Sequence, residues 1–118
     1  MPSMKYHGKI LGRALPPMED EAAAAFLDDF AVSDDPDKPI TAGLFRLEAG
    51  EAMTYTYTYH EIKLIVDGQF EIHDGDSGET VTATAGDLFY FPKGCTITFT
   101  TPEFGLGYFC GQRGPGEA

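Results

Sequence analysis

The chain has 118 residues, which is enough for one domain and too few for two substantial ones. Its 19 Asp and Glu residues against 8 Lys and Arg give a formal charge of -11, and a field of that sign repels nucleic-acid phosphates and anionic lipid surfaces. No apolar run reaches the ~20 residues of a membrane span, no signal-peptide core follows the first residues, and two cysteines are too few for a disulfide scaffold. The sequence therefore predicts an acidic, cytoplasmic, single-domain protein that binds neither nucleic acid nor membranes.

Apolar residues recur at helical spacing near the N-terminus. Steps of four lead from Met18 through Ala22 and Phe26 to Phe30, and Ala25 follows Ala22 by three residues. The acidic residues 19–21 lie where the helix dipole favours anions, and the polar, proline-containing run 33–39 ends the pattern. This spacing predicts a short amphipathic helix from about residue 18 to residue 30. Residues 1–39 are thus expected to supply an N-terminal strand or helix and an acidic linker that pack on the domain that follows.

Residues 40–112 have the two-residue period of β-strands. Seven or eight short strands are expected, at 43–48, 53–59, 61–66, 69–73, 80–84, 88–91, 95–100 and 106–110. Asp67-Gly68 is typical of a tight hairpin turn, and a second turn is expected within 74–78. Short strands at this spacing, with no helix among them, favour an all-β sandwich or barrel. Residues 113–118 are expected to form a flexible tail.

Two motifs in this region resemble the signatures of the cupin superfamily. Residues 86–94 have the pattern Gly-x5-Pro-x-Gly, and Glu61 precedes Gly68 as at the end of the first signature. Residues 59–68 resemble in style the small cupins of the ethanolamine-utilisation EutQ type. The resemblance covers about residues 42–111. It implies a jelly-roll β-barrel (a double-stranded β-helix) with one internal pocket for a small-molecule ligand, and a homodimer in which N-terminal strands pair across the interface.

The histidines of metal-binding cupins are missing at the corresponding positions. These positions fall on Thr54 and Thr56 (or on Tyr55 and Tyr57 with the shorter spacing) and on Ile97, so that only Glu61 remains. A catalytic transition metal usually needs three protein ligands, and no cofactor is therefore predicted. The alternative is a divalent metal held by Glu61 and His60, which needs an irregular strand because adjacent residues point to opposite faces.

Glu61 and Lys63 are the candidate catalytic pair. Residues two apart on a strand share a face, with Cα atoms about 6.5–7 Å apart. If the resemblance places Glu61 inside the barrel, Lys63 lies there too, where burial lowers its pKa and the carboxylate raises it. Such a pair can act as general base and general acid, or bind an anion, with Tyr57 as a proton donor. The alternatives are a structural ion pair, or a lysine that reaches outward to solvent.

A second group of residues is expected to contact the ligand. Thr and Tyr alternate along 53–59, which places three tyrosines on one face of the strand and threonines on the other. Phenols that face a pocket can stack on flat or sugar-like ligands, although the same row is typical of a sheet packed against another layer. The predicted substrate-binding residues are Tyr55, Thr56, Tyr90, Ile97 and Phe99.

Two classes of function follow from these residues. The main prediction is a metal-independent or atypical enzyme, an isomerase or lyase, that performs acid–base chemistry on a small polar or sugar-like substrate by isomerisation, epimerisation, dehydration or elimination. The alternative is a non-catalytic EutQ-like accessory or binding module, and a metal-dependent cupin with non-standard ligands is a further one. Ionisable groups that converge in a cavity favour the enzyme, and a barrel filled by aromatic side chains favours the module.

Overall fold

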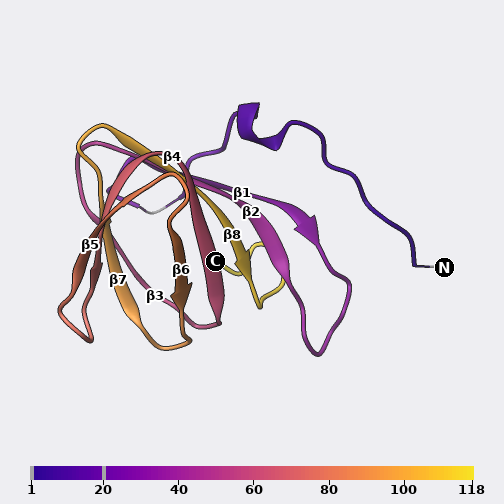
Figure 1. Ribbon diagram of the computed structural model, residues 1–118. Helices are drawn as coiled ribbons and strands as arrows, with labels where there is room; N and C mark the ends of the chain where they lie inside the picture. The colour runs from indigo at the N-terminus through magenta and orange to yellow at the C-terminus, as the bar shows by residue number, and fades with distance from the viewer. Residues whose placement is uncertain (1, 20) are drawn as a thin grey trace.

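The structure is a computed structural model that describes residues 2–19 and 21–118 (Figure 1). Within these ranges the chain forms an antiparallel sheet of eight strands, in the order β1-β2-β8-β4-β7-β3, and β5 and β6 also pair with β4. The strands are β1 (Ala25–Val32), β2 (Thr41–Glu48), β3 (Met53–Thr56), β4 (Glu61–Asp74), β5 (Thr80–Thr84), β6 (Leu88–Phe91), β7 (Thr96–Thr100) and β8 (Phe104–Gly111). Along the described residues, no helix has the length and apolar character needed to span a bilayer.

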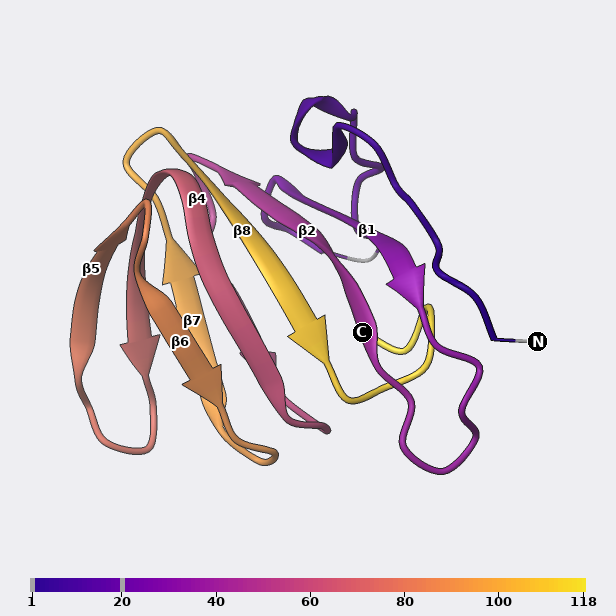
Figure 2. The ribbon, with the colours of Figure 1, turned by 45° about the vertical axis from the view of Figure 1, so that its right-hand side comes forward.

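The sheet curls into two facing layers but does not close into the predicted barrel. One layer holds β1, β2, β8, β6 and the first half of β4, and the other holds β3, β7, β5 and the second half of β4. β1 and β3 lie at the two ends of the strand order and do not pair with each other, which leaves a half-barrel (Figure 2). The all-β prediction is therefore confirmed, and the closed barrel is wrong.

The predicted N-terminal helix is also wrong. In the described residues the helical element is the 3-10 turn η1 (Ile10–Gly12), and the second half of the predicted helix forms β1 instead. Ala25 lies opposite Leu47 of β2, and both side chains are buried in the core. Pairing with β2 outweighs the local helical pattern because it satisfies the backbone of a whole strand and buries its inner face. Asp20, within the predicted helix, lies outside the described residues.

The predicted hairpin turn at Asp67-Gly68 is wrong, because β4 continues through these two residues. Its register shifts between Ile65 and Asp67, which marks a β-bulge, and Gly68 takes a left-handed conformation with φ 68°. A bulge bends a strand and increases its twist, so that β4 leaves one layer and enters the other. The flexible backbone of Asp67-Gly68 therefore forms a bend within one strand, and not a turn between two strands.

Aromatic side chains fill the space between the layers. Phe45, Phe70, Phe99 and Phe109 are each no more than 2% exposed. The Phe45 ring centroid lies 5.9 Å from that of Phe70 and 5.5 Å from that of Phe99, within the usual range for interacting rings. These rings therefore leave little free space in the part of the interior that they fill.

Replacing Gly68 by alanine tests the bend in β4. An added Cβ would overlap the carbonyl oxygen of Phe104, and alanine would also be strained at this positive φ. Gly78 is the matched control, because its φ is also positive and nothing lies within 4 Å of an added Cβ. In urea unfolding we expect Gly78→Ala to lower the free energy of unfolding by about 1 kcal/mol and Gly68→Ala by at least about 2 kcal/mol. Equal losses would contradict the close approach to Phe104.

Candidate functional site

Tyr57, Glu61 and Lys63 form one cluster inside the half-barrel. Glu61 and Lys63 project from the inner face of β4 and are each 4% exposed. The Lys63 Nζ atom lies 3.3 Å from Glu61 Oε2, and the Tyr57 hydroxyl donates a hydrogen bond of 2.7 Å to the same oxygen. Lys63 also donates to the Tyr57 hydroxyl at 3.4 Å. The prediction that Glu61 and Lys63 share the inner face is confirmed.

The second cupin-like motif holds Tyr57 in place. β3 ends at Thr56, and the backbone of the next residue, Tyr57, forms hydrogen bonds with Gly94, the last residue of the Pro-x-Gly corner, and with Cys95. The Tyr57 amide donates to the Cys95 carbonyl at 2.9 Å, and the Tyr57 carbonyl accepts from the Gly94 amide at 2.7 Å. Gly94 has a positive φ of 98°, which glycine adopts without strain. The Pro-x-Gly corner therefore sets the position of Tyr57 relative to β4.

Aromatic rings surround the Lys63 ammonium. Its Nζ atom lies 4.6 Å from the ring centroids of both Phe45 and Phe99. Burial lowers the pKa of Lys63, and the neighbouring Glu61 carboxylate offsets part of this effect. Burial and the Glu61 charge raise the pKa of Tyr57, so that the phenol keeps its proton. Chemically, the cluster holds a lysine that gives up its proton more readily than usual and a phenol that donates to a carboxylate.

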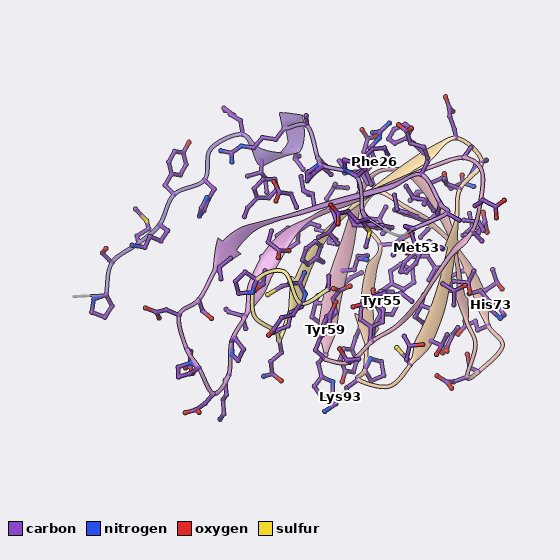
Figure 3. The ribbon with its side chains drawn as sticks, turned by 180° about the vertical axis from the view of Figure 1, so that it is seen from behind. Phe26, Met53, Tyr55, Tyr59, His73 and Lys93 are labelled. Carbon is purple, nitrogen blue, oxygen red and sulfur yellow. The ribbon has the colours of Figure 1, made fainter. Side chains whose placement is uncertain are left out.

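Tyr55 and Tyr59 extend the cluster toward one end of the half-barrel. Their hydroxyls are 3.1 Å apart, and their ring centroids lie 4.8 Å and 5.6 Å from that of Tyr57. Burial and the hydrogen bond with Tyr55 raise the pKa of Tyr59. These contacts confirm the prediction that the three tyrosines share one face. Figure 3 shows Tyr55 and Tyr59 beside the C-terminal segment.

The cavity at this cluster is very small. Its volume is about 20 Å³, and Phe45, Phe99 and Phe109 line it together with the three clustered side chains. Such a volume holds about one water molecule. Met18 and Leu27 line it from the side of β1, and Ala118 lines it from the C-terminal segment. In this arrangement, no organic molecule of several heavy atoms fits beside the ion pair.

Arg113 ties the C-terminal segment to β1. Its guanidinium donates to both carboxylate oxygens of Asp29, at 2.9 Å and 3.1 Å, and its Cζ atom lies 5.4 Å from the Tyr59 ring centroid. The Gly116 amide donates to the same carboxylate at 2.8 Å. Burial raises the pKa of Asp29, but the hydrogen bonds from Arg113 and Gly116 outweigh it and hold that pKa below its usual value. Sequence reasoning missed this pair, since no local pattern links residues 84 positions apart.

The other predicted site residues divide between the two faces of the sheet. Phe99 lines the small cavity, and Ile97 is buried nearby in the core. Thr56 and Tyr90 lie on outer faces instead: Thr56 bonds to Thr96, and Tyr90 is 57% exposed. The structure therefore does not bring Thr56 or Tyr90 to the ion pair.

The residues at the cupin metal positions do not fit a transition-metal centre. His60 points outward, where its Nδ1 atom pairs with the Tyr90 hydroxyl at 2.9 Å. Glu61 is already engaged by Lys63 and Tyr57, and Thr54 bonds to a threonine on the outer face. Within residues 2–19 and 21–118, no group of three or more His, Cys, Asp or Glu side chains is placed to hold a metal ion.

Comparisons with known proteins agree on the family and the fold. The family model described as "Ethanolamine utilisation protein EutQ" matches residues 19–109. The acetate kinase EutQ of Escherichia coli (strain K12) is 35% identical over 75 residues, which make up 64% of this chain and 30% of that protein. The crystal structure of an ethanolamine utilization protein Q from Salmonella typhimurium has a TM-score of 0.71 at 25% identity and covers 83% of this chain and 77% of that chain.

A more distant structure supports the fold alone. The cupin domain of Cnp3 from Schizosaccharomyces pombe has a TM-score of 0.68 at 12% identity, over 87% of this chain and 66% of that chain. The predicted cupin resemblance is thus confirmed. The chain spans about a third or less of the length of the curated relatives it matches, at 20%, 30% and 31%.

The pH dependence of stability tests the burial of Lys63. Below pH 10.5, the usual pKa of lysine, the unfolded chain keeps the Lys63 proton, whereas the folded chain releases it earlier. The unfolded state then binds more protons, so stability rises with pH in this window. From neutral pH up to pH 10.0, where ordinary tyrosines ionise, we expect wild type to gain stability relative to Lys63→Met. The free energy of unfolding is measured in urea at each pH, and the exposed Lys38→Met is the control, which should show the same change with pH as wild type. If the free energy of unfolding of Lys63→Met changed with pH as that of wild type does, the lowered pKa would be contradicted.

Asp29→Asn tests the contact that holds the C-terminal segment. The lowered pKa means that Asp29 stabilises the fold above the carboxylate's usual pKa of 3.8, and that this stability is lost as pH falls through the folded-state pKa. At neutral pH we expect Asp29→Asn to lower the free energy of unfolding by about 1–2 kcal/mol, since the pair is partly exposed to solvent.

Hydrogen exchange adds a local readout to this experiment. The Gly116 amide should exchange faster in Asp29→Asn, and the stability difference from wild type should shrink in acid. The control is Asp28→Asn, on the same strand, because the Asp28 side chain has no hydrogen bond or ion pair to any of the residues that the structure describes. Unchanged exchange at Gly116 would contradict the contact.

Proposed function

Because this chain belongs to the EutQ family, whose fold is that of the cupins, we propose that it is an accessory cupin that binds a small polar ligand without transforming it. The observation that carries this proposal is the volume of about 20 Å³ beside the Tyr57–Glu61–Lys63 cluster. An enzyme site normally leaves room for its substrate next to the reacting groups. Here aromatic rings occupy that room, which disfavours catalysis on a substrate of several heavy atoms while the C-terminal segment stays in place.

The cluster supplies donors and acceptors for a very small polar ligand. Lys63 and Tyr57 offer donors, and Glu61 offers a carboxylate, all within 3.4 Å of one another. A larger ligand needs the C-terminal segment to move away from Tyr59, because Arg113 and Ala118 lie at that end of the cavity. We therefore expect ligand entry to compete with the contact between Arg113 and Asp29.

Acid–base catalysis is the second candidate function. It is favoured by the lowered pKa of Lys63 and by the hydrogen bond from Tyr57 to Glu61. In an isomerase or lyase of this kind, Glu61 would remove a proton and Tyr57 or Lys63 would return one. The relatives named acetate kinase suggest phosphoryl transfer as another activity to assay, although this chain spans a third or less of those proteins.

A paired screen for binding and turnover distinguishes the candidates. Small carboxylates, sugar acids and amino alcohols are screened by ligand-observed NMR, and each binder is then assayed for chemical change, with acetate plus ATP included. We expect binding without turnover, weakened at least about tenfold in Glu61→Gln because a buried charged partner is lost. Glu51→Gln, an exposed glutamate on a loop, is the matched control and should bind as wild type does.

Two results would overturn the proposal. Binding that is unchanged in a folded Glu61→Gln protein would place the ligand elsewhere. Turnover that Glu61→Gln removes would favour the acid–base enzyme. Glu61→Gln combined with Lys63→Met provides a second variant if Glu61→Gln does not fold, since replacing both members of a buried ion pair by uncharged side chains of similar volume is often tolerated.

A further inference from the structure

A second and much larger pocket lies on the other side of Phe91 from the ion pair. Its volume is about 290 Å³, and its walls come from the end of β4, from β5, β6 and β7, and from the turns that join them. Phe91 lines this pocket, and its ring stacks on that of Tyr57 with the two centroids 5.0 Å apart. His73, next to the pocket residues Ile72 and Asp74, lies across the half-barrel from Tyr59 (Figure 3).

The topology explains why this space exists. β5 and β6 each pair with β4, β5 with its second half and β6 with its first half, and they are not paired with each other. The two layers therefore separate along this side, where no strand bridges them. The walls of the gap are mainly apolar and aromatic: Ile72, Val81, Phe89, Phe91, Pro92 and Ile97.

The charged residues that line the pocket all have the same sign. Asp74, Asp76 and Glu79 lie along one side, and among the described residues that line the pocket none is basic. Hydrogen bonds from the Asp76 amide and the Ser77 hydroxyl lower the pKa of Asp74, which therefore keeps its negative charge. Cys95, only 8% exposed, also lines the pocket. Burial and the charges of Asp74 and Asp76 raise the pKa of its thiol, as expected for a negative potential that reaches the pocket interior.

We infer that this pocket binds an organic ammonium ion that carries an apolar group. The carboxylates of Asp76 and Glu79 attract the ammonium, and the rings of Phe89 and Phe91 offer an apolar surface for the rest of the molecule. A carboxylate or phosphate ligand would be repelled by the same acids. A bare metal ion would lack ligands, because the described residues hold no group of three side chains that could coordinate one.

This inference does not depend on the proposed function of the Tyr57–Glu61–Lys63 cluster. The two pockets share no lining residue, and among the described residues no hydrogen bond or ion pair joins the acids of the larger pocket to Glu61 or Lys63. Loss of one binding activity would therefore leave the other intact. Variants at Glu61 and variants at Glu79 separate the two experimentally.

Binding of three probes of the same shape tests the charge preference. Phenethylammonium, phenethyl alcohol and phenylacetate differ in charge and are titrated by NMR. We expect phenethylammonium to bind at least about fivefold more tightly than the alcohol, and phenylacetate to bind most weakly, because each exposed carboxylate adds a modest attraction. Raising the salt concentration should reduce this preference.

A charge-matched pair of variants locates the effect. Asp76→Asn combined with Glu79→Gln removes two carboxylates from the pocket, and the preference for the ammonium should fall to about twofold or less. Asp37→Asn combined with Glu51→Gln removes two exposed carboxylates elsewhere and should keep the preference. Any general effect of net charge is the same in both proteins, so only the pocket effect distinguishes them.

The reactivity of Cys95 gives an independent readout. In a Cys110→Ser background, a methanethiosulfonate reagent transfers its thioalkyl group to the Cys95 thiolate, which forms a disulfide and releases methanesulfinate. We expect the cationic trimethylammonium-ethyl reagent to react faster than the anionic sulfonatoethyl reagent, and phenethylammonium to slow both. The Asp76→Asn, Glu79→Gln protein should lose most of this difference in rate.

Three outcomes would overturn the inference. The first is equal affinity for the amine and the alcohol, which would make the pocket merely apolar. The second is a preference for the amine that persists in the Asp76→Asn, Glu79→Gln protein. The third is an absence of phenethylammonium binding together with an absence of protection at Cys95.

Discussion

The buried ion pair between Glu61 and Lys63 constrains the interior of the whole half-barrel. Removing two such charges from water costs several kcal/mol per ion, so the pair is tolerated only with short, well-directed contacts. The Tyr57 hydroxyl completes these contacts at 2.7 Å, and the rings of Phe45 and Phe99 face the ammonium. The aromatic core is therefore part of the same arrangement, because it excludes water from the pair and also favours the cation.

β4 connects this pair to the rest of the fold. Its first half carries Glu61 and Lys63 in one layer, and after the bulge at Gly68 its second half forms the other layer. A single strand thus belongs to both layers. The same strand leaves β5 and β6 unpaired with each other, which opens the acidic pocket on the far side of Phe91.

The two sites differ in what closes them. At the tyrosine end, Arg113 and Gly116 bond to Asp29, and the C-terminal segment lies against Tyr59. The acidic pocket has no comparable cover from this segment, since the residues that line it all lie between positions 72 and 97. The contact between Arg113 and Asp29 therefore holds the segment that covers the tyrosine end, whereas the acidic pocket is not covered by this segment.

The sequence alone determined the features that depend on local periodicity. Alternating strand residues correctly predicted an all-β chain, the shared inner face of Glu61 and Lys63, and the row of three tyrosines, and two short motifs were enough to indicate the cupin resemblance. The tertiary structure decided the rest. Residues 25–32 form a strand because β2 offers them a partner, and β4 continues through Asp67-Gly68 because each half has its own neighbours. Arg113 reaches Asp29 across 84 positions, and no local pattern encodes such a contact, because it depends on the path of the whole chain.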